Sequence, residues 1–153
     1  MKYIKIFELF NYTAYDSDFK LIKTDGDLQG FKTIQYEFHI EDDIYECFFL
    51  KMEGELKYER LYRKKHGSFG QQVGKSAYKT IAIVSEITIN FLKIINPNII
   101  HIDHMNMRDE KYTGDINKRA RINRQYLSKV LPKNYTLEYI PNVKGTECYI
   151  TKN

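Results

Sequence analysis

From residue 75 to residue 95 the apolar side chains recur every three or four positions. This spacing is that of a helix, and the polar residues form one narrow stripe along it: Lys79, Glu86, Asn90 and Lys93. A helix with so little polar surface must be covered on most of its sides. We therefore predict a central helix that packs on a sheet, with Ile81, Val84 and Phe91 almost fully buried.

Segments rich in aromatic and β-branched residues lie on both sides of this helix. Before it come residues 33–40, 44–52 and 56–62, which are separated by short polar breaks. Breaks this short join neighbouring antiparallel strands, so these segments are predicted to form a meander. After Asn96-Pro97-Asn98 ends the helix, residues 99–104 are predicted as a buried strand, and 135–140 with 146–151 as a closing hairpin.

A second helix is predicted over residues 116–131, with Asp115 as its N-cap and Pro132 after its end. Its apolar spacing places four residues toward the core: Ile116, Ala120, Leu127 and Val130. Five basic residues are predicted to face solvent: Lys118, Arg119, Arg121, Arg124 and Lys129.

The order of these elements predicts a single α/β (α+β) domain over residues 1–153. Its sheet is expected to be mixed but mainly antiparallel, with two main helices, in the order β-β-β-α-β-α-β-β. Residues 1–32 are predicted to be an irregular N-terminal segment, because Asp25-Gly26-Asp27 and Gly30 are typical of turns.

The sequence argues against a membrane or secreted protein. The most apolar stretch, residues 81–95, carries Glu86, Asn90 and Lys93, whereas a membrane span needs roughly 18–20 apolar residues. Charged residues near the start do not fit a signal peptide. Cys47 and Cys148 are too far apart for a metal spacing and are expected to be buried free thiols. We therefore expect an intracellular protein.

The two ends of the chain differ in charge. Residues 1–56 hold 6 basic and 12 acidic side chains, whereas residues 57–153 hold 18 basic and 8 acidic ones. A surplus of positive charge suits phosphate or nucleic acid, but it is also found on faces that only meet water. Both interpretations stay open at this point.

The element order resembles that of the GNAT superfamily of N-acetyltransferases over about residues 33–151. In that family a Gln/Arg-x-x-Gly-x-Gly/Ala signature before the central helix holds acetyl-CoA. Here Gln71-Gln72-Val73-Gly74-Lys75-Ser76 stands at that place. The resemblance implies that Gln71, Gly74, Lys75 and Ser76 would bind the cofactor, with Ser76 where the family has Gly or Ala.

The resemblance also implies a catalytic pair. Glu59, on the strand before the loop, would be the general base, and Tyr126, on the second helix, would be the general acid. Family members normally open with a strand and two helices that help to form the acceptor site. Residues 12–31 are too short for both helices. The usual acceptor groove is therefore expected to be incomplete.

A narrower resemblance is to small uncharacterised bacteriophage proteins with a truncated GNAT-like domain. It rests on Tyr36-Glu37-Phe38, on the central helix with Asn96-Pro97-Asn98 after it, and on the Arg-rich second helix. It implies a protein of the virion or the host cytoplasm. Because the acid/base pair and acceptor helices are incomplete, we expect no catalysis and no cofactor, but binding to a viral or host protein partner. Acetyl-CoA-dependent N-acetyl transfer is the alternative.

Two further interpretations concern metal and nucleic acid. In His101-Ile102-Asp103-His104, strand alternation places His101 and Asp103 on one face and His104 on the other, so no metal site is expected. The outer face of the second helix, with Arg119, Arg121 and Arg124, is a second alternative, because it could follow a phosphate backbone.

Overall fold

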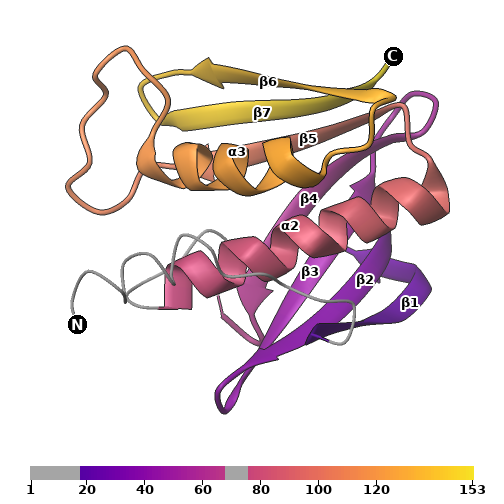
Figure 1. Cartoon of the computed structure of the whole chain (residues 1–153). Helices are drawn as coiled ribbons and strands as arrows, with labels where there is room; N and C mark the ends of the chain where they lie inside the picture. Colours follow the sequence, from indigo (N-terminus) through magenta and orange to yellow (C-terminus); the bar gives the residue numbers. More distant parts are fainter. Residues whose placement is uncertain (1–17, 68–75) are drawn as a thin grey trace.

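The strands form one sheet, with two helices on it, in a computed structural model that describes residues 18–67 and 76–153. The order across the sheet is β1-β2-β3-β4-β5-β7-β6 (Figure 1). The strands are β1 (Phe19–Leu28), β2 (Phe31–Ile40), β3 (Asp43–Lys51), β4 (Lys57–Lys64), β5 (Ile99–Met105), β6 (Tyr135–Pro141) and β7 (Gly145–Lys152). The helices are α2 (Ser76–Ile95) and α3 (Lys118–Val130). The predicted fold class, a mixed and mainly antiparallel sheet with two main helices, is confirmed.

The predicted irregular segment 1–32 is wrong for Phe19–Leu28, which forms β1 and pairs antiparallel with β2. The Asp-Gly-Asp sequence lies within this strand, where shifts in register accommodate it. The turn lies at Gln29 and Gly30, both with positive φ, so the turn expected at Gly30 is confirmed, and the Gly30 N–H donates to Asp27 Oδ1 at 3.2 Å. Most β1 side chains are exposed, so the strand has no buried alternation to reveal it. Residues 1–17 lie outside the described ranges.

Helix α2 is central, as predicted. Ile81, Val84 and Phe91 are all buried, and the Phe91 side chain is 0% exposed. The Phe91 ring stacks on Phe49 with 3.9 Å between centroids and meets the edge of Tyr58 at 4.9 Å. Helix α2 crosses the β1–β4 half of the sheet (Figure 1) and also contacts α3. In the described part of the chain, no helix is long and apolar enough to cross a membrane.

The start of α3 differs from the prediction. Asn117, rather than Asp115, is the N-cap, and its Oδ1 accepts from the Ala120 N–H at 3.0 Å. The Asn117 Nδ2 also donates to the His104 carbonyl at 2.6 Å, which ties the helix to β5. Asp115 Oδ1 accepts from the next N–H, that of Ile116.

The inner face of α3 is mostly as predicted. Ile116, Ala120 and Leu127 are buried. The prediction that Val130 faces the core is wrong, because this side chain is 46% exposed. The helix ends at Val130, and Leu131, in an extended conformation, packs against the core instead.

Candidate functional site

Strands β4 and β5 form the parallel pair of the sheet, and they separate partway along their length. They pair only from Lys57–Arg60 to Ile99–Ile102. Beyond this point β4 continues to Lys64 beside β3, while β5 continues to Met105 beside β7. The two halves of the sheet therefore diverge, as Figure 1 shows. We call the gap between these diverging strands the wedge.

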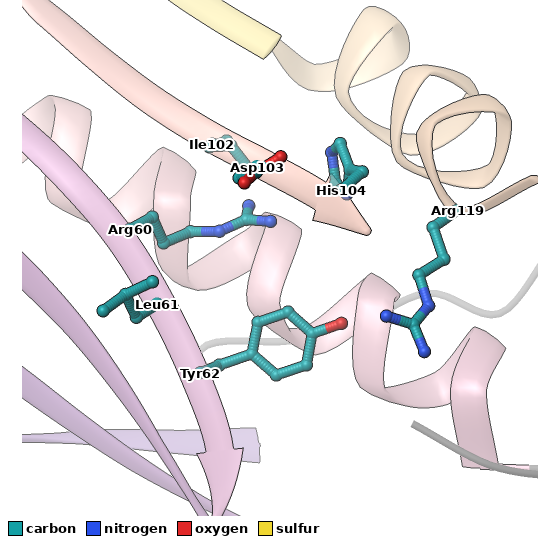
Figure 2. A pocket seen from close by; sticks show the side chains of 7 residues that line it. All are labelled: Arg60, Leu61, Tyr62, Ile102, Asp103, His104 and Arg119. Atoms are coloured by element: carbon teal, nitrogen blue, oxygen red, sulfur yellow. The ribbon is translucent and has the colours of Figure 1, made fainter. Parts of the chain in front are cut away.

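The wedge contains a cavity of about 40 Å³. Its lining comes from β4, β5 and α3: Arg60, Leu61, Tyr62, Ile102, Asp103, His104 and Arg119. Figure 2 shows Arg60 pointing from β4 toward β5, and Arg119 extending from α3 toward the same gap. Long side chains of the protein itself therefore narrow the gap between the strands.

Arg60 is a buried cation. It is 3% exposed, and its Nη1 donates to Thr88 Oγ1 at 3.0 Å. Its guanidinium carbon lies 5.9 Å from the centroid of the Tyr62 ring. Within residues 18–67 and 76–153, its Nε has no hydrogen-bond partner and no carboxylate forms an ion pair with it. A buried charge without a counter-charge destabilises a fold, so this residue calls for an explanation.

His104 lies on the opposite wall of the wedge. It is 5% exposed, and its Nε2 has no hydrogen-bond partner among the described residues. Burial, and next the positive charge of Arg60, lower the pKa of His104 to about 3. At pH 7 the imidazole is therefore neutral. Burial raises the pKa of Tyr62, although Arg60 and Arg119 lower it in part, so this phenol is neutral too.

The prediction that Arg119 faces solvent is wrong. Arg119 is 7% exposed and lines the wedge, whereas Arg121 and Arg124 are exposed. The reason is helical spacing, because Arg119 lies three and four positions before the buried Ile122 and Asn123. That spacing was visible in the sequence. The outer face of α3 therefore keeps only two of the three arginines predicted there.

Arg60 was not among the site residues predicted from the sequence. On strand β4 it alternates with Glu59 and lies between Tyr58 and Tyr62. Tyr58 contacts Phe91 of α2, so strand alternation turns Arg60 toward the helices as well. The available signal was an arginine with one aromatic residue two positions before it and another two positions after it.

Glu59 and Tyr126, the predicted catalytic pair, lie on opposite faces of the sheet. Glu59 alternates with Tyr58 and Arg60, both of which meet α2, so it points away from the helices. Tyr126 is on α3, which lies on the helix side, since Asn123 of α3 accepts from the Tyr139 hydroxyl of β6. The roles of this pair stay predictions, with the sheet between their two side chains.

Glu59 instead belongs to a small polar cluster on the face away from the helices. Glu59 Oε1 lies 3.6 Å from His101 Nδ1, and Glu147 Oε1 lies 3.0 Å from His101 Nε2. The Tyr149 ring is 5.0 Å from the imidazole. These contacts arise because His101 is in register with Glu59 on β4 and with Tyr149 on β7.

The remaining predictions concern the cofactor residues, a metal site and the two cysteines. Gln71, Gly74 and Lys75 lie outside the described residues, and Ser76 is the first residue of α2. In the described ranges no group of three or more acidic, His or Cys side chains is placed to hold a metal ion. The cysteines Cys47 and Cys148 are free and buried, as predicted.

The arrangement brings two guanidinium groups and two neutral polar side chains to a small enclosed space. Such a space can bind a small anion, whereas nothing described within it supplies an acid and a base side by side. No known protein family, no curated protein and no solved structure matches this chain.

Proposed function

We propose that this protein is a non-catalytic binding protein with a GNAT-like architecture, which acts by contacting a viral or host protein partner. The observation that carries this proposal is the small volume of the wedge. The protein's own side chains narrow it to a cavity of about 40 Å³. The resemblance to small bacteriophage proteins supplies the setting, a virion or the cytoplasm of a host cell.

The size of the cavity is the first support. Sites for cofactor-sized molecules usually enclose about 300–1,000 Å³, whereas a single water needs roughly 10–15 Å³. A cavity of about 40 Å³ accommodates a group of a few atoms. It does not accommodate the long pantetheine arm of acetyl-CoA unless Arg60 or Tyr62 moves.

The hairpin between β1 and β2 is the second support. Leu28 pairs with Phe31, so only Gln29 and Gly30 connect these strands. The acceptor-site helices that the GNAT resemblance implies have no room in this turn. The separation of Glu59 from Tyr126 by the sheet points in the same direction.

Acetyl-CoA-dependent N-acetyl transfer is the second candidate, and the divergence of β4 from β5 favours it. In this alternative Gln71, Gly74, Lys75 and Ser76 hold the pyrophosphate at the start of α2. Glu59 removes a proton from the acceptor amine, and Tyr126 protonates the leaving thiolate.

Calorimetric titration with acetyl-CoA separates the two candidates. We expect no measurable heat of binding, since a cavity of about 40 Å³ is too small for the pantetheine arm. Saturable micromolar binding that is lost in Gly74→Val would replace our proposal with the enzyme, because a side chain at Gly74 would block close approach of the pyrophosphate to the backbone. Circular dichroism of Gly74→Val would show that the rest of the fold persists.

A second experiment tests for the partner itself. A photoreactive amino acid at Asp103, which is exposed at the wedge, should give a discrete adduct in cells that express the protein. The matched position is Lys129, which is exposed on the outer face of α3. Equal adducts from both positions, or none from Asp103, would argue against a partner at the wedge.

A further inference from the structure

We infer that the wedge between β4 and β5 is a binding site for a single carboxylate group, which Arg60 and Arg119 hold. This inference rests on the proposed function, because it names the chemical group that a bound partner would present. It makes the wedge a specific recognition site rather than a filled gap.

The first step is the unbalanced charge of Arg60. Its side chain is 97% buried, yet its polar contacts in the described residues are one hydroxyl and one aromatic ring. Its Nε has no hydrogen-bond acceptor in the part of the chain that the structure describes. Burying a cation in this way costs stability, and an anion that arrives from outside would offset the cost.

The second step is that the neighbours do not cancel this charge. His104 and Tyr62 are neutral at pH 7, because burial lowers the pKa of His104 and raises that of Tyr62. The Asp103 carboxylate also lines the cavity, but this residue is exposed and lies in register with Glu147 of β7. The Arg60 guanidinium group therefore has no buried carboxylate paired with it among the described residues.

The third step concerns size and shape. The cavity of about 40 Å³ lies between two strands, and a carboxylate is a planar group of three heavy atoms. The guanidinium fork matches such a group with paired hydrogen bonds. A phosphate group is tetrahedral and larger, so we assign the site to a carboxylate.

Two sources can supply this group: a small free carboxylate, or an acidic side chain or chain end of a protein. The test begins with sodium acetate, titrated against sodium chloride at equal ionic strength while the melting temperature is followed. We expect a saturable rise with acetate in the wild type, because a ligand that binds only the folded state stabilises it.

Three variants give this test its specificity. Arg60→Met keeps the length of the side chain but removes the charge, and should lose at least about tenfold in acetate affinity, the scale of one charge-assisted hydrogen bond. Arg121→Met removes an exposed arginine from the same region of the chain and should bind acetate like the wild type. Asp103→Asn removes the repelling carboxylate and should bind acetate more tightly.

A peptide with one internal glutamate, compared with the same peptide carrying glutamine, then identifies the source. Tighter binding of the glutamate peptide than of acetate supports a protein carboxylate, and equal affinity supports a small free acid. The inference is overturned if acetate gives no saturable response, or if Arg60→Met responds like the wild type. If Arg60→Met does not fold, Arg119→Met replaces it under the same criterion.

These outcomes are independent of the acetyl-CoA titration. Binding of acetyl-CoA with no response to acetate would remove both proposals. An acetate response without acetyl-CoA binding supports both, whereas failure of acetate alone removes only the carboxylate site.

Discussion

Two neighbouring turns of α2 face the same sheet and are equally buried, yet their surroundings have opposite chemistry. At Phe91 the helix meets a stack of aromatic rings from β3 and β4. One turn earlier, Thr88 meets the guanidinium group of Arg60. Both side chains of α2 are 0% exposed. Burial alone therefore does not distinguish the region that stabilises this fold from the region that we propose binds a ligand.

The difference lies in how each region satisfies its buried groups. The aromatic region, which includes Phe49, Tyr58 and Phe91, removes apolar surface from water through packed rings. The wedge keeps Arg60 Nε and His104 Nε2 without partners in the described part of the chain. Natural proteins usually satisfy buried polar groups, so such exceptions mark a cost that function can explain.

The largest expected effect is in the aromatic region. Phe91→Ala should lower the free energy of unfolding by about 3–5 kcal/mol, because it removes a fully buried ring and leaves a cavity. Lys93→Ala, at an exposed position of the same helix, should change it by less than about 0.5 kcal/mol. Urea denaturation measures both. A loss below about 1 kcal/mol for Phe91→Ala would contradict the central position of α2.

A slightly smaller effect is expected where α3 joins the wedge half of the sheet. Asn117→Ala removes the N-cap and leaves the buried His104 carbonyl without the Asn117 donor, which together should cost about 2–4 kcal/mol. Asn117→Asp keeps the cap but loses the donor, so its loss should be intermediate. Denaturation of both variants by urea tests this order. Equal stability of Asn117→Ala and wild type would contradict the anchoring role.

The pH dependence of stability tests the wedge directly. The folded protein keeps His104 neutral down to about pH 3, whereas the unfolded chain binds a proton near pH 6.5. Between these values the unfolded state holds more protons, so stability falls as the pH is lowered through this window. The loss from pH 7 to pH 5 should be about 2 kcal/mol for this group.

His104→Gln should flatten this part of the profile, and urea denaturation at several pH values measures it. The comparison variant is His39→Gln, because His39 is exposed and lies outside the wedge. An identical slope in His104→Gln and wild type would mean that His104 is not held neutral in the folded protein.

The aromatic region was predictable from the sequence, because its signals are regular. Apolar spacing in α2 is repeated over five turns, and strands β2–β4 alternate or run apolar between short breaks. Strand β1 was not predictable in this way. Its side chains are mostly exposed. Gly26 is of a residue type typical of turns, although it lies opposite Thr33 within the sheet.

The wedge was harder to predict, because it depends on where two distant strands stop pairing. Local patterns placed Glu59 and Tyr126 on suitable elements but did not show that the sheet separates them. Arg60 and Arg119 are charged, and charged residues are assigned to the surface by default. Only the strand alternation in β4 and the helical spacing in α3 indicated that these two arginines face the core. Neither pattern showed that the pairing of strands across the sheet brings them together.

The smallest expected effect separates the two kinds of arginine on α3. Arg121 is exposed, so Arg121→Ala should change stability by less than about 0.5 kcal/mol.

If the outer face of α3 follows a nucleic-acid backbone, the same variant should lower the slope of log affinity against log salt by about one, because one phosphate contact is lost. Arg119→Met should leave this slope unchanged, since a buried guanidinium group cannot reach a phosphate outside. Fluorescence anisotropy with a labelled DNA duplex measures both slopes. Of these two variants we expect only Arg121→Ala to change the slope. If Arg121→Ala leaves affinity and slope unchanged, the outer face of α3 only meets water.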